Sequence, residues 1–230
     1  AITAGTPALY GFTPDERKAF GRQFLDVGIA EQTAVAMASA IAKNGGKPVF
    51  NVYSSFIQRT YDQLSQDLCI DSNPATILVQ TASVNGMTDV THLGIFDIPM
   101  ISNIPNLVYI APTTKEDYLA VLDWSIEQTD YPVAIRVPVA ELVSTGEPCT
   151  KNFAELNKYE VAQQGGKIAV IALGSFYGMG EQAAKLIEEK TGTAPTLINP
   201  YYITGVDTEL LESLKKDHEV VVTLEDGVLD

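Results

Sequence analysis

The chain has 230 residues, of which 46% are hydrophobic, and it carries a formal net charge of −14. This length and apolar content suffice for one large or two modest domains, each with a real core. The acidic charge argues against nucleic acid and anionic membrane surfaces as partners, because both attract Lys and Arg. We also expect no membrane span, since no stretch approaches the roughly 20 consecutive apolar residues that one needs.

The N-terminus and the cysteines bear on the cellular compartment. Residues 1–4 read A-I-T-A, lack the order of a secretory signal and resemble the interior of a domain. We therefore expect a piece of a longer protein. Cys69 and Cys149 are not spaced as a metal-binding or redox pair, so we interpret both as small buried apolar residues of a reducing, cytoplasmic environment.

Residues 1–145 alternate strand-like runs with helical segments. The strand-like runs are short, apolar and bounded by turn formers: residues 48–53, 76–80, 107–111 and 133–137. Such continuous apolar runs are typical of buried parallel strands. The pattern predicts an α/β fold with a mostly parallel sheet flanked by helices.

The helices expected between these strands differ in their signals. Residues 30–42 are rich in Ala and end before a glycine pair, and a later helix begins after Thr114 with acidic residues in its first turn. Residues 56–68 form the third expected helix. One face of that helix would carry four side chains spaced one turn apart, namely Phe56, Thr60, Leu64 and Leu68.

A polar segment, residues 146–164, interrupts this rhythm and is interpreted as a linker. Beyond it, residues 165–230 repeat the strand and helix alternation. Strands are expected at residues 167–173, 195–199 and 219–224, and helices at residues 177–190 and 207–216. The second α/β domain stops just after a strand, so we expect it to be incomplete.

Three motifs carry a resemblance to a known family. They are D-V-G-I-A-E-Q at residues 26–32, Y-S-S-F-I-Q-R-T-Y-D-Q at residues 53–63, and T-H-L-G-I-F-D at residues 91–97. In order and separation they resemble the pyrimidine-binding domain of the transketolase superfamily, and specifically the 1-deoxy-D-xylulose-5-phosphate synthases. Residues 165–230 resemble the start of that family's C-terminal domain more loosely.

The resemblance implies a thiamine-diphosphate-dependent transferase. Such an enzyme decarboxylates pyruvate and transfers the two-carbon unit to glyceraldehyde 3-phosphate, a step toward isoprenoid precursors. The cofactor is an electron sink, and the protein positions it and tunes its electronics. A carboxyl group at the pyrimidine ring nitrogen helps the cofactor to lose its thiazolium proton, and burial favours the protonated carboxyl that this requires.

The resemblance also implies roles for five residues. Glu31 would be the catalytic carboxyl at the pyrimidine ring, although on its own it reads as an acidic residue favourably placed at a helix start. Phe56 would stack on that ring, and Arg59 would complete the cofactor-binding set. Tyr53 and His92 would face the substrate, with His92 also serving as a catalytic proton-transfer or orienting group. Asp97, by contrast, is expected to brace the loop.

Three positions depart from the family pattern. Thr81 and Val139 stand where the family has arginines that grip the acceptor phosphate, and Thr88 replaces an aspartate four residues before His92. Neither Thr nor Val can replace the bidentate fork of arginine. The acceptor is therefore open: glyceraldehyde 3-phosphate, an unphosphorylated aldehyde, or none.

The residues expected to hold the diphosphate are not in this sequence. The family binds Mg²⁺ and the diphosphate through a G-D-G motif in a preceding domain, and no such triplet occurs here. We expect the chain alone to be inactive, to contain no metal ligands, and to depend on a preceding domain or a separate subunit. The resemblance implies a homodimer acting on a small keto acid and an aldehyde.

Alternative assignments remain open from the sequence. The chain is also compatible with the C-terminal section or split subunit of a transketolase, or with a 2-oxoacid dehydrogenase β-subunit that uses another acceptor. A different class is a non-catalytic module kept for dimerisation or regulation. Retention of Glu31 and Phe56 argues against that last class, because a scaffold has no need of a carboxyl group beside an aromatic platform.

Overall fold

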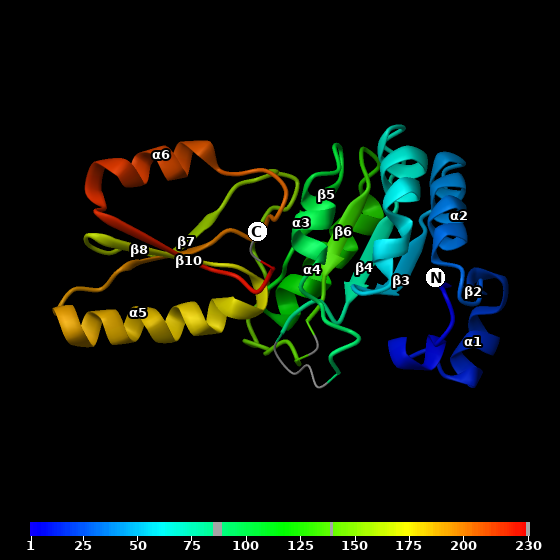
Figure 1. The fold of residues 1–230 in the computed structure, drawn as a ribbon, viewed down its shortest axis with the longest axis horizontal. Coiled ribbons are helices and arrows are strands. Elements are labelled where there is room, and N and C mark those ends of the chain that lie inside the picture. The colour runs from blue at the N-terminus through cyan, green and yellow to red at the C-terminus, as the bar shows by residue number, and fades with distance from the viewer. Residues whose placement is uncertain (85–88, 139, 229–230) are drawn as a thin grey trace.

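The computed structural model describes residues 1–84, 89–138 and 140–228, and it contains two sheets (Figure 1). The first sheet has six strands in the order β2-β1-β3-β4-β6-β5, all parallel. Their bounds are β1 Ile2–Thr3, β2 Leu25–Asp26, β3 Val49–Tyr53, β4 Thr76–Gln80, β5 Val108–Ile110 and β6 Val133–Arg136. The predicted α/β fold with a mostly parallel sheet is confirmed.

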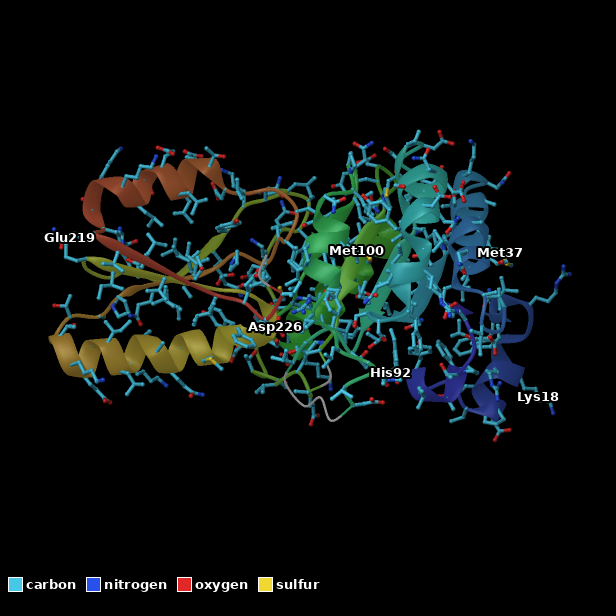
Figure 2. All side chains as sticks on the ribbon, viewed as in Figure 1. Lys18, Met37, His92, Met100, Glu219 and Asp226 are labelled. Atoms are coloured by element: carbon cyan, nitrogen blue, oxygen red, sulfur yellow. The ribbon has the colours of Figure 1, made fainter. Side chains whose placement is uncertain are left out.

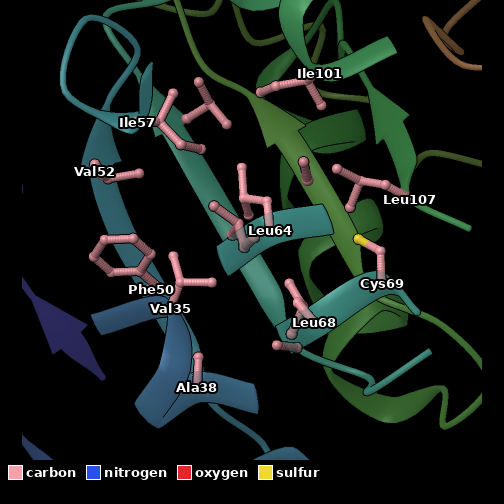
Figure 3. Close-up of a cluster of buried hydrophobic side chains, with 14 of the residues drawn as sticks. Val35, Ala38, Phe50, Val52, Ile57, Leu64, Leu68, Cys69, Ile101 and Leu107 are labelled. Carbon is pink, nitrogen blue, oxygen red and sulfur yellow. The ribbon is translucent and has the colours of Figure 1, made fainter. Parts of the chain in front are cut away.

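Helices cover both faces of this sheet. One face carries α2 (Glu31–Lys43), α3 (Asp97–Ser102) and the helical segment η4 (Gln63–Cys69), whose apolar side chains form the main core with β3 and β4 (Figure 3). The other face carries α4 (Lys115–Glu127), which begins with a capping box between Thr114 and Asp117. Short elements precede β2, namely η1 (Pro7–Tyr10), α1 (Pro14–Phe20) and η2 (Gly21–Gln23).

The segment predicted as one α-helix over residues 56–68 is a different structure. It consists of a 3₁₀ turn, η3 (Ile57–Thr60), followed after one short turn by η4, which is a π-helix. Thr60, Leu64 and Leu68 are fully buried, as the expected face requires, while Phe56 is only half-buried. The wider π turn brings the side chain of Cys69 into the core beside Leu68, a register that an α-helical repeat does not provide.

The second sheet has four strands in the order β10-β8-β9-β7. Strands β8 (Ile168–Ala172), β9 (Thr196–Asn199) and β10 (Val220–Leu224) are parallel and were predicted. Strand β7 (Glu160–Gln163) lies in the segment expected to be a linker and pairs antiparallel with β9. Its residues are largely exposed, so it lacks the apolar run that identified the others. Helix α5 (Tyr177–Thr191), which follows the turn η5 (Gly174–Phe176), and helix α6 (Thr208–Asp217) flank this sheet.

Backbone hydrogen bonds link the two sheets, in addition to the covalent connection between them. Ala111 N donates to Tyr201 O at 2.8 Å, and Ile203 N donates to Tyr109 O at 2.8 Å. Tyr201 and Tyr202 also complete the core on the α4 face of the first sheet. The carboxyl ends of the parallel strands in the second sheet therefore meet the first sheet directly.

Both cysteines are unpaired thiols, but only one matches the expectation of burial. Cys69 lies in the main core, whereas Cys149 is half-buried. Burial raises the pKa of the Cys69 thiol to about 12 and that of the Cys149 thiol to about 11. Both are therefore neutral thiols near pH 7.

None of the helices in the described part of the chain is long and apolar enough to cross a membrane.

Candidate functional site

The carboxyl edge of the first sheet gathers the residues that the motifs singled out. Tyr53 is the last residue of β3, Glu31 is the first residue of α2, and His92 lies in the connection from β4 to α3. Phe56 follows Tyr53 in the next turn, and Arg59 lies in η3, three residues after Phe56. Because all six strands are parallel, these connections leave the sheet at the same edge, which is where open α/β sheets bind ligands.

Glu31 is a buried carboxyl group at the start of a helix. The preceding turn is held by Asp26, whose Oδ1 accepts from Gly5 N at 2.8 Å and from Gly28 N at 3.1 Å. Gly28 has a φ of +70°, a conformation that favours glycine. The turn places Glu31 where only 2% of the residue is exposed. Arg59 Nη1 donates to Glu31 Oε2 at 3.3 Å, from a side chain that is 54% exposed.

Aromatic rings form a cluster at the same edge of the sheet. Tyr53 and Phe56 stack with ring centroids 5.5 Å apart and an interplanar angle of 22°. The His92 ring meets Phe56 edge-on at 5.2 Å and Tyr53 at 6.3 Å. The structure thus brings together three of the predicted site residues, two of which, Tyr53 and Phe56, are half-buried and offer a flat apolar surface.

Tyr10 is a member of the cluster that sequence reasoning missed. Its ring packs edge-on against Tyr53 with centroids 5.5 Å apart. Burial raises the pKa of Tyr10 to about 12, and the nearby charges of Tyr53 and Glu31 add to this shift, while hydrogen bonding with Thr6 opposes it. Tyr10 therefore joins the aromatic cluster through its contact with Tyr53. It belongs to a short 3₁₀ turn with no motif, so only the tertiary fold reveals it.

His92 has a carboxylate partner that the sequence did not predict. Its Nδ1 lies 2.9 Å from Asp89 Oδ2 and 2.8 Å from Thr91 Oγ1. Hydrogen bonds from Thr91, together with His92, hold the pKa of Asp89 below its usual value. An anionic Asp89 accepts from Nδ1–H, so Nε2 is the nitrogen that can exchange a proton. Thr88, which stands where the family has an aspartate, lies outside the described residues.

Thr81 has a backbone role in place of a charged one. It adopts a φ of +55°, which is uncommon for a β-branched residue, and its hydroxyl donates to Gln80 O at 2.6 Å. The Thr81 carbonyl accepts from Ser54 Oγ at 3.2 Å and faces Gly94, where a Cβ atom would lie 2.0 Å from it. Only glycine allows this approach. Val139, the other departure from the family pattern, lies outside the described residues.

Asp97 is fully buried and acts as a brace, as the sequence led us to expect. Its Oδ2 accepts from Arg136 Nε at 2.7 Å and from the Tyr109 hydroxyl at 2.5 Å. Within residues 1–84, 89–138 and 140–228, no group of three or more His, Cys, Asp or Glu side chains is arranged to hold a metal ion.

Comparisons with known proteins agree with this arrangement. The family described as transketolase, pyrimidine binding domain, matches residues 9–144, and the family described as transketolase, C-terminal domain, matches residues 157–230. A 1-deoxy-D-xylulose-5-phosphate synthase from Clostridium perfringens is 40% identical over 229 residues, and one from Clostridium beijerinckii is 37% identical over 230 residues. These alignments cover 99% and 100% of this chain, but the chain spans only 36% of the length of each relative.

The fold also matches solved structures at lower sequence identity. A split gene transketolase, solved as an inactive beta4 tetramer, superposes with a TM-score of 0.81 at 23% identity. That match covers 99% of this chain and 73% of the other. The likeness concerns the fold, whereas the two family matches together account for most of the sequence. The chain therefore belongs to the transketolase family, with that family's pyrimidine-binding domain followed by its C-terminal domain.

Proposed function

We propose that this chain supplies the pyrimidine half of the cofactor site in a thiamine-diphosphate-dependent transferase that acts as a 1-deoxy-D-xylulose-5-phosphate synthase. The observation that carries the proposal is the buried Glu31 carboxyl group, which Arg59 contacts at 3.3 Å, three residues after Phe56, whose ring stacks on that of Tyr53. The 40% identity to the Clostridium perfringens synthase over 229 residues supports the choice of reaction.

The residues present fit an aminopyrimidine ring. A carboxyl group with 2% exposure offers a directional hydrogen bond in a site with little water, where it is worth more than at the surface. Phe56 offers a half-buried flat face, and stacking on such a face contributes about 0.5–1.5 kcal/mol beyond burial. Once bound, thiamine diphosphate supplies the electron sink for cleaving a bond next to a carbonyl group.

Each side chain then has a defined task. Glu31 holds a proton at the pyrimidine ring nitrogen, and Arg59 keeps that carboxyl oriented through their 3.3 Å contact. His92, fixed through Nδ1 by Asp89, moves a proton through Nε2 to or from the substrate. Tyr53 lies at the substrate side of the cluster, and Tyr10, whose pKa of about 12 keeps it neutral, packs behind Tyr53 and excludes water.

We propose that the acceptor is an aldehyde. The open question is whether this aldehyde carries a phosphate, as glyceraldehyde 3-phosphate does, or is unphosphorylated. At Thr81, where the family pattern would have an arginine, the hydroxyl donates to Gln80 O at 2.6 Å, and the carbonyl accepts from Ser54 Oγ at 3.2 Å. This favours an unphosphorylated aldehyde over glyceraldehyde 3-phosphate, because no guanidinium group extends from that position.

The whole enzyme requires parts beyond these residues. We propose that Mg²⁺ and the diphosphate are held by another domain or subunit, that the chain alone is inactive, and that the assembly is a homodimer. The 36% coverage of the synthase relatives supports a larger enzyme. The free thiols of Cys69 and Cys149 support a reducing compartment such as the cytoplasm.

The second candidate is a split enzyme, in which two genes encode the two parts. The split gene transketolase described above has the same fold over 73% of its length. A coding sequence with the diphosphate-binding domain on the same polypeptide would exclude it. A separate gene for that domain would favour it.

The direct test uses the full-length protein. Calorimetric titration with thiamine diphosphate and Mg²⁺ should show binding, and pyruvate should be consumed when an aldehyde is supplied. We expect glyceraldehyde to serve at least as well as glyceraldehyde 3-phosphate. Absence of cofactor binding would end the catalytic proposal. Binding without pyruvate consumption, but with ketol transfer from a sugar phosphate, would reassign the protein as a transketolase.

A further inference from the structure

Arg136 is a buried cation held by carboxylates from both halves of the chain. It ends β6 with 2% of its side chain exposed, and its Nη1 donates to Asp226 Oδ1 at 2.5 Å. Its Nε donates to Asp97 Oδ2 at 2.7 Å. Burial alone would lower the pKa of Arg136, but the neighbouring carboxylates outweigh burial and raise it. The guanidinium group is therefore charged at every pH at which the protein is folded.

The same residues hold the loop that carries His92. Arg136 Nη2 donates to Gly94 O at 3.0 Å, two residues beyond His92. Val228 N donates to Ile95 O at 2.9 Å, so the segment after β10 pairs directly with this loop. The loop between His92 and α3 is thus bound from β6 on one side and from residues 226–228 on the other.

Asp226 also reaches the other flank of the connection between β4 and α3. Its Oδ2 accepts from Val84 N at 3.2 Å and from Ser175 Oγ at 3.3 Å, and Ser175 Oγ lies 3.0 Å from Ser83 Oγ. Figure 2 places Asp226 at the end of β10, where the second unit meets the first, and His92 on the lower side of the first unit. Asp226 therefore binds the β4 side of the connection directly, at Val84, and reaches the α3 side through Arg136.

We propose that Asp226 is a positioning residue for His92. Asp226 acts on the loop at residues 91–97 through Arg136 and through Val228, which follows Asp226 in the chain. These contacts keep the imidazole of His92 at 5.2 Å from the Phe56 ring. The His92 side chain is 36% exposed, so packing alone does not fix it, and its place depends on the backbone that presents it. The effect on catalysis rests on the proposed function. The tether, by which we mean the contacts through which Asp226 and Arg136 hold the loop at residues 91–97, does not.

A purely structural ion pair is the competing explanation. Buried ion pairs often contribute little net stability, although removing one partner is strongly destabilising. On that explanation, loss of Asp226 would loosen the whole molecule evenly. On ours, the loop at residues 91–97 loosens first, because Arg136 and Val228, which contact it, are no longer held by Asp226, while the main core keeps its packing.

The test compares variants of the full-length protein by backbone amide hydrogen exchange and by steady-state kinetics. Asp226→Asn removes the charge at nearly constant size, and Asp226→Glu restores it. Ser175→Ala removes the contacts of the Ser175 hydroxyl with Asp226 and Ser83 but keeps the Asp226 charge, and it serves as a milder variant. Glu219→Gln is the control, because Glu219 stands just before β10 and pairs with Lys167 at 2.9 Å with both side chains 70% exposed.

We expect exchange at residues 91–97 to rise about tenfold or more in Asp226→Asn and less in Ser175→Ala, with no change in Glu219→Gln. The kcat should fall by about tenfold or more, while the dissociation constant of thiamine diphosphate stays within about twofold. Asp226→Glu should recover part of both losses.

Unchanged exchange at residues 91–97, or an equal rise across α2 and β3, would overturn the proposal. If Asp226→Asn fails to fold, Ser175→Ala decides by the same exchange criterion. If the wild-type protein neither binds the cofactor nor turns over, the proposed function fails, and the exchange result still decides the tether.

Discussion

At the residue scale, single contacts bear on the chemistry of the proposed site. Asp89 gives an example: its carboxylate lies 2.9 Å from His92 Nδ1, and its depressed pKa, which results mainly from hydrogen bonds with Thr91, keeps it anionic near pH 7. The motif with the histidine was visible in the sequence, but its partner occupies a position one residue away from the family aspartate. A pattern that searches fixed spacings does not find such a replacement, because a turn allows either neighbour to reach the ring.

Replacing Asp89 by Asn should impair turnover without affecting folding. The amide cannot fix the Nδ1–H tautomer as an anion does, so Nε2 loses its defined role. We expect kcat to fall by about tenfold or more, with thiamine diphosphate affinity unchanged. Asp71→Asn, which breaks an exposed pair with Lys43, is the matched control. A kcat for Asp89→Asn equal to that of the control would show that Asp89 does not orient His92.

Local sequence predicted most elements, because the buried parallel strands are continuous apolar runs. The run at residues 76–80 coincides with β4, and the helix expected at residues 177–190 matches α5 within one residue. Strands β1 and β2 were not predicted from the sequence, because two residues are too few to form a pattern. The π-helix η4 escaped because its register depends on burying Cys69 as well as Leu68. Element type was thus predictable where burial follows a simple period and not where tertiary packing changes that period.

A carboxylate at the start of α4 predicts how stability depends on pH. Glu116 accepts hydrogen bonds from Ser144, Thr145 and Gly146, and these lower its pKa from 4.5 to about 2. The folded state therefore binds this proton less readily than the unfolded chain does. Its contribution to stability is present above about pH 4.5 and is lost as the pH falls toward 2.

Glu116→Gln should therefore lower the melting temperature at pH 7 but not at about pH 2 and below, where wild type and variant should converge. Thermal unfolding of the full-length protein across this range measures the difference. Glu147→Gln, in the same exposed segment, controls for the change in net charge. A constant difference between Glu116→Gln and wild type at all pH values would contradict the assigned pKa.

At the scale of the whole molecule, strands of the two sheets meet at their carboxyl ends. The carboxyl ends of β6 and β10 meet through Arg136 and Asp226, which are 90 residues apart in the chain. The sequence motifs predicted Glu31 and Phe56 for the cofactor half of the site, because those residues belong to local patterns. The sequence could not reveal the brace between the units, which depends on how the units pack, or Tyr10, whose contact with Tyr53 depends on the tertiary fold of the first unit.

The most direct test of the central claim compares Glu31→Gln with Glu209→Gln in the full-length protein. Both residues are first-turn helical glutamates with a cationic partner: Arg59 at 3.3 Å for Glu31 and Lys158 at 3.0 Å for Glu209. Turnover of pyruvate with an aldehyde is measured alongside the melting temperature. We predict that Glu31→Gln keeps its fold and loses activity by about 100-fold or more, while Glu209→Gln keeps wild-type activity. Turnover by Glu31→Gln within about twofold of Glu209→Gln, or unfolding of Glu31→Gln alone, would show that Glu31 serves the helix and not the cofactor.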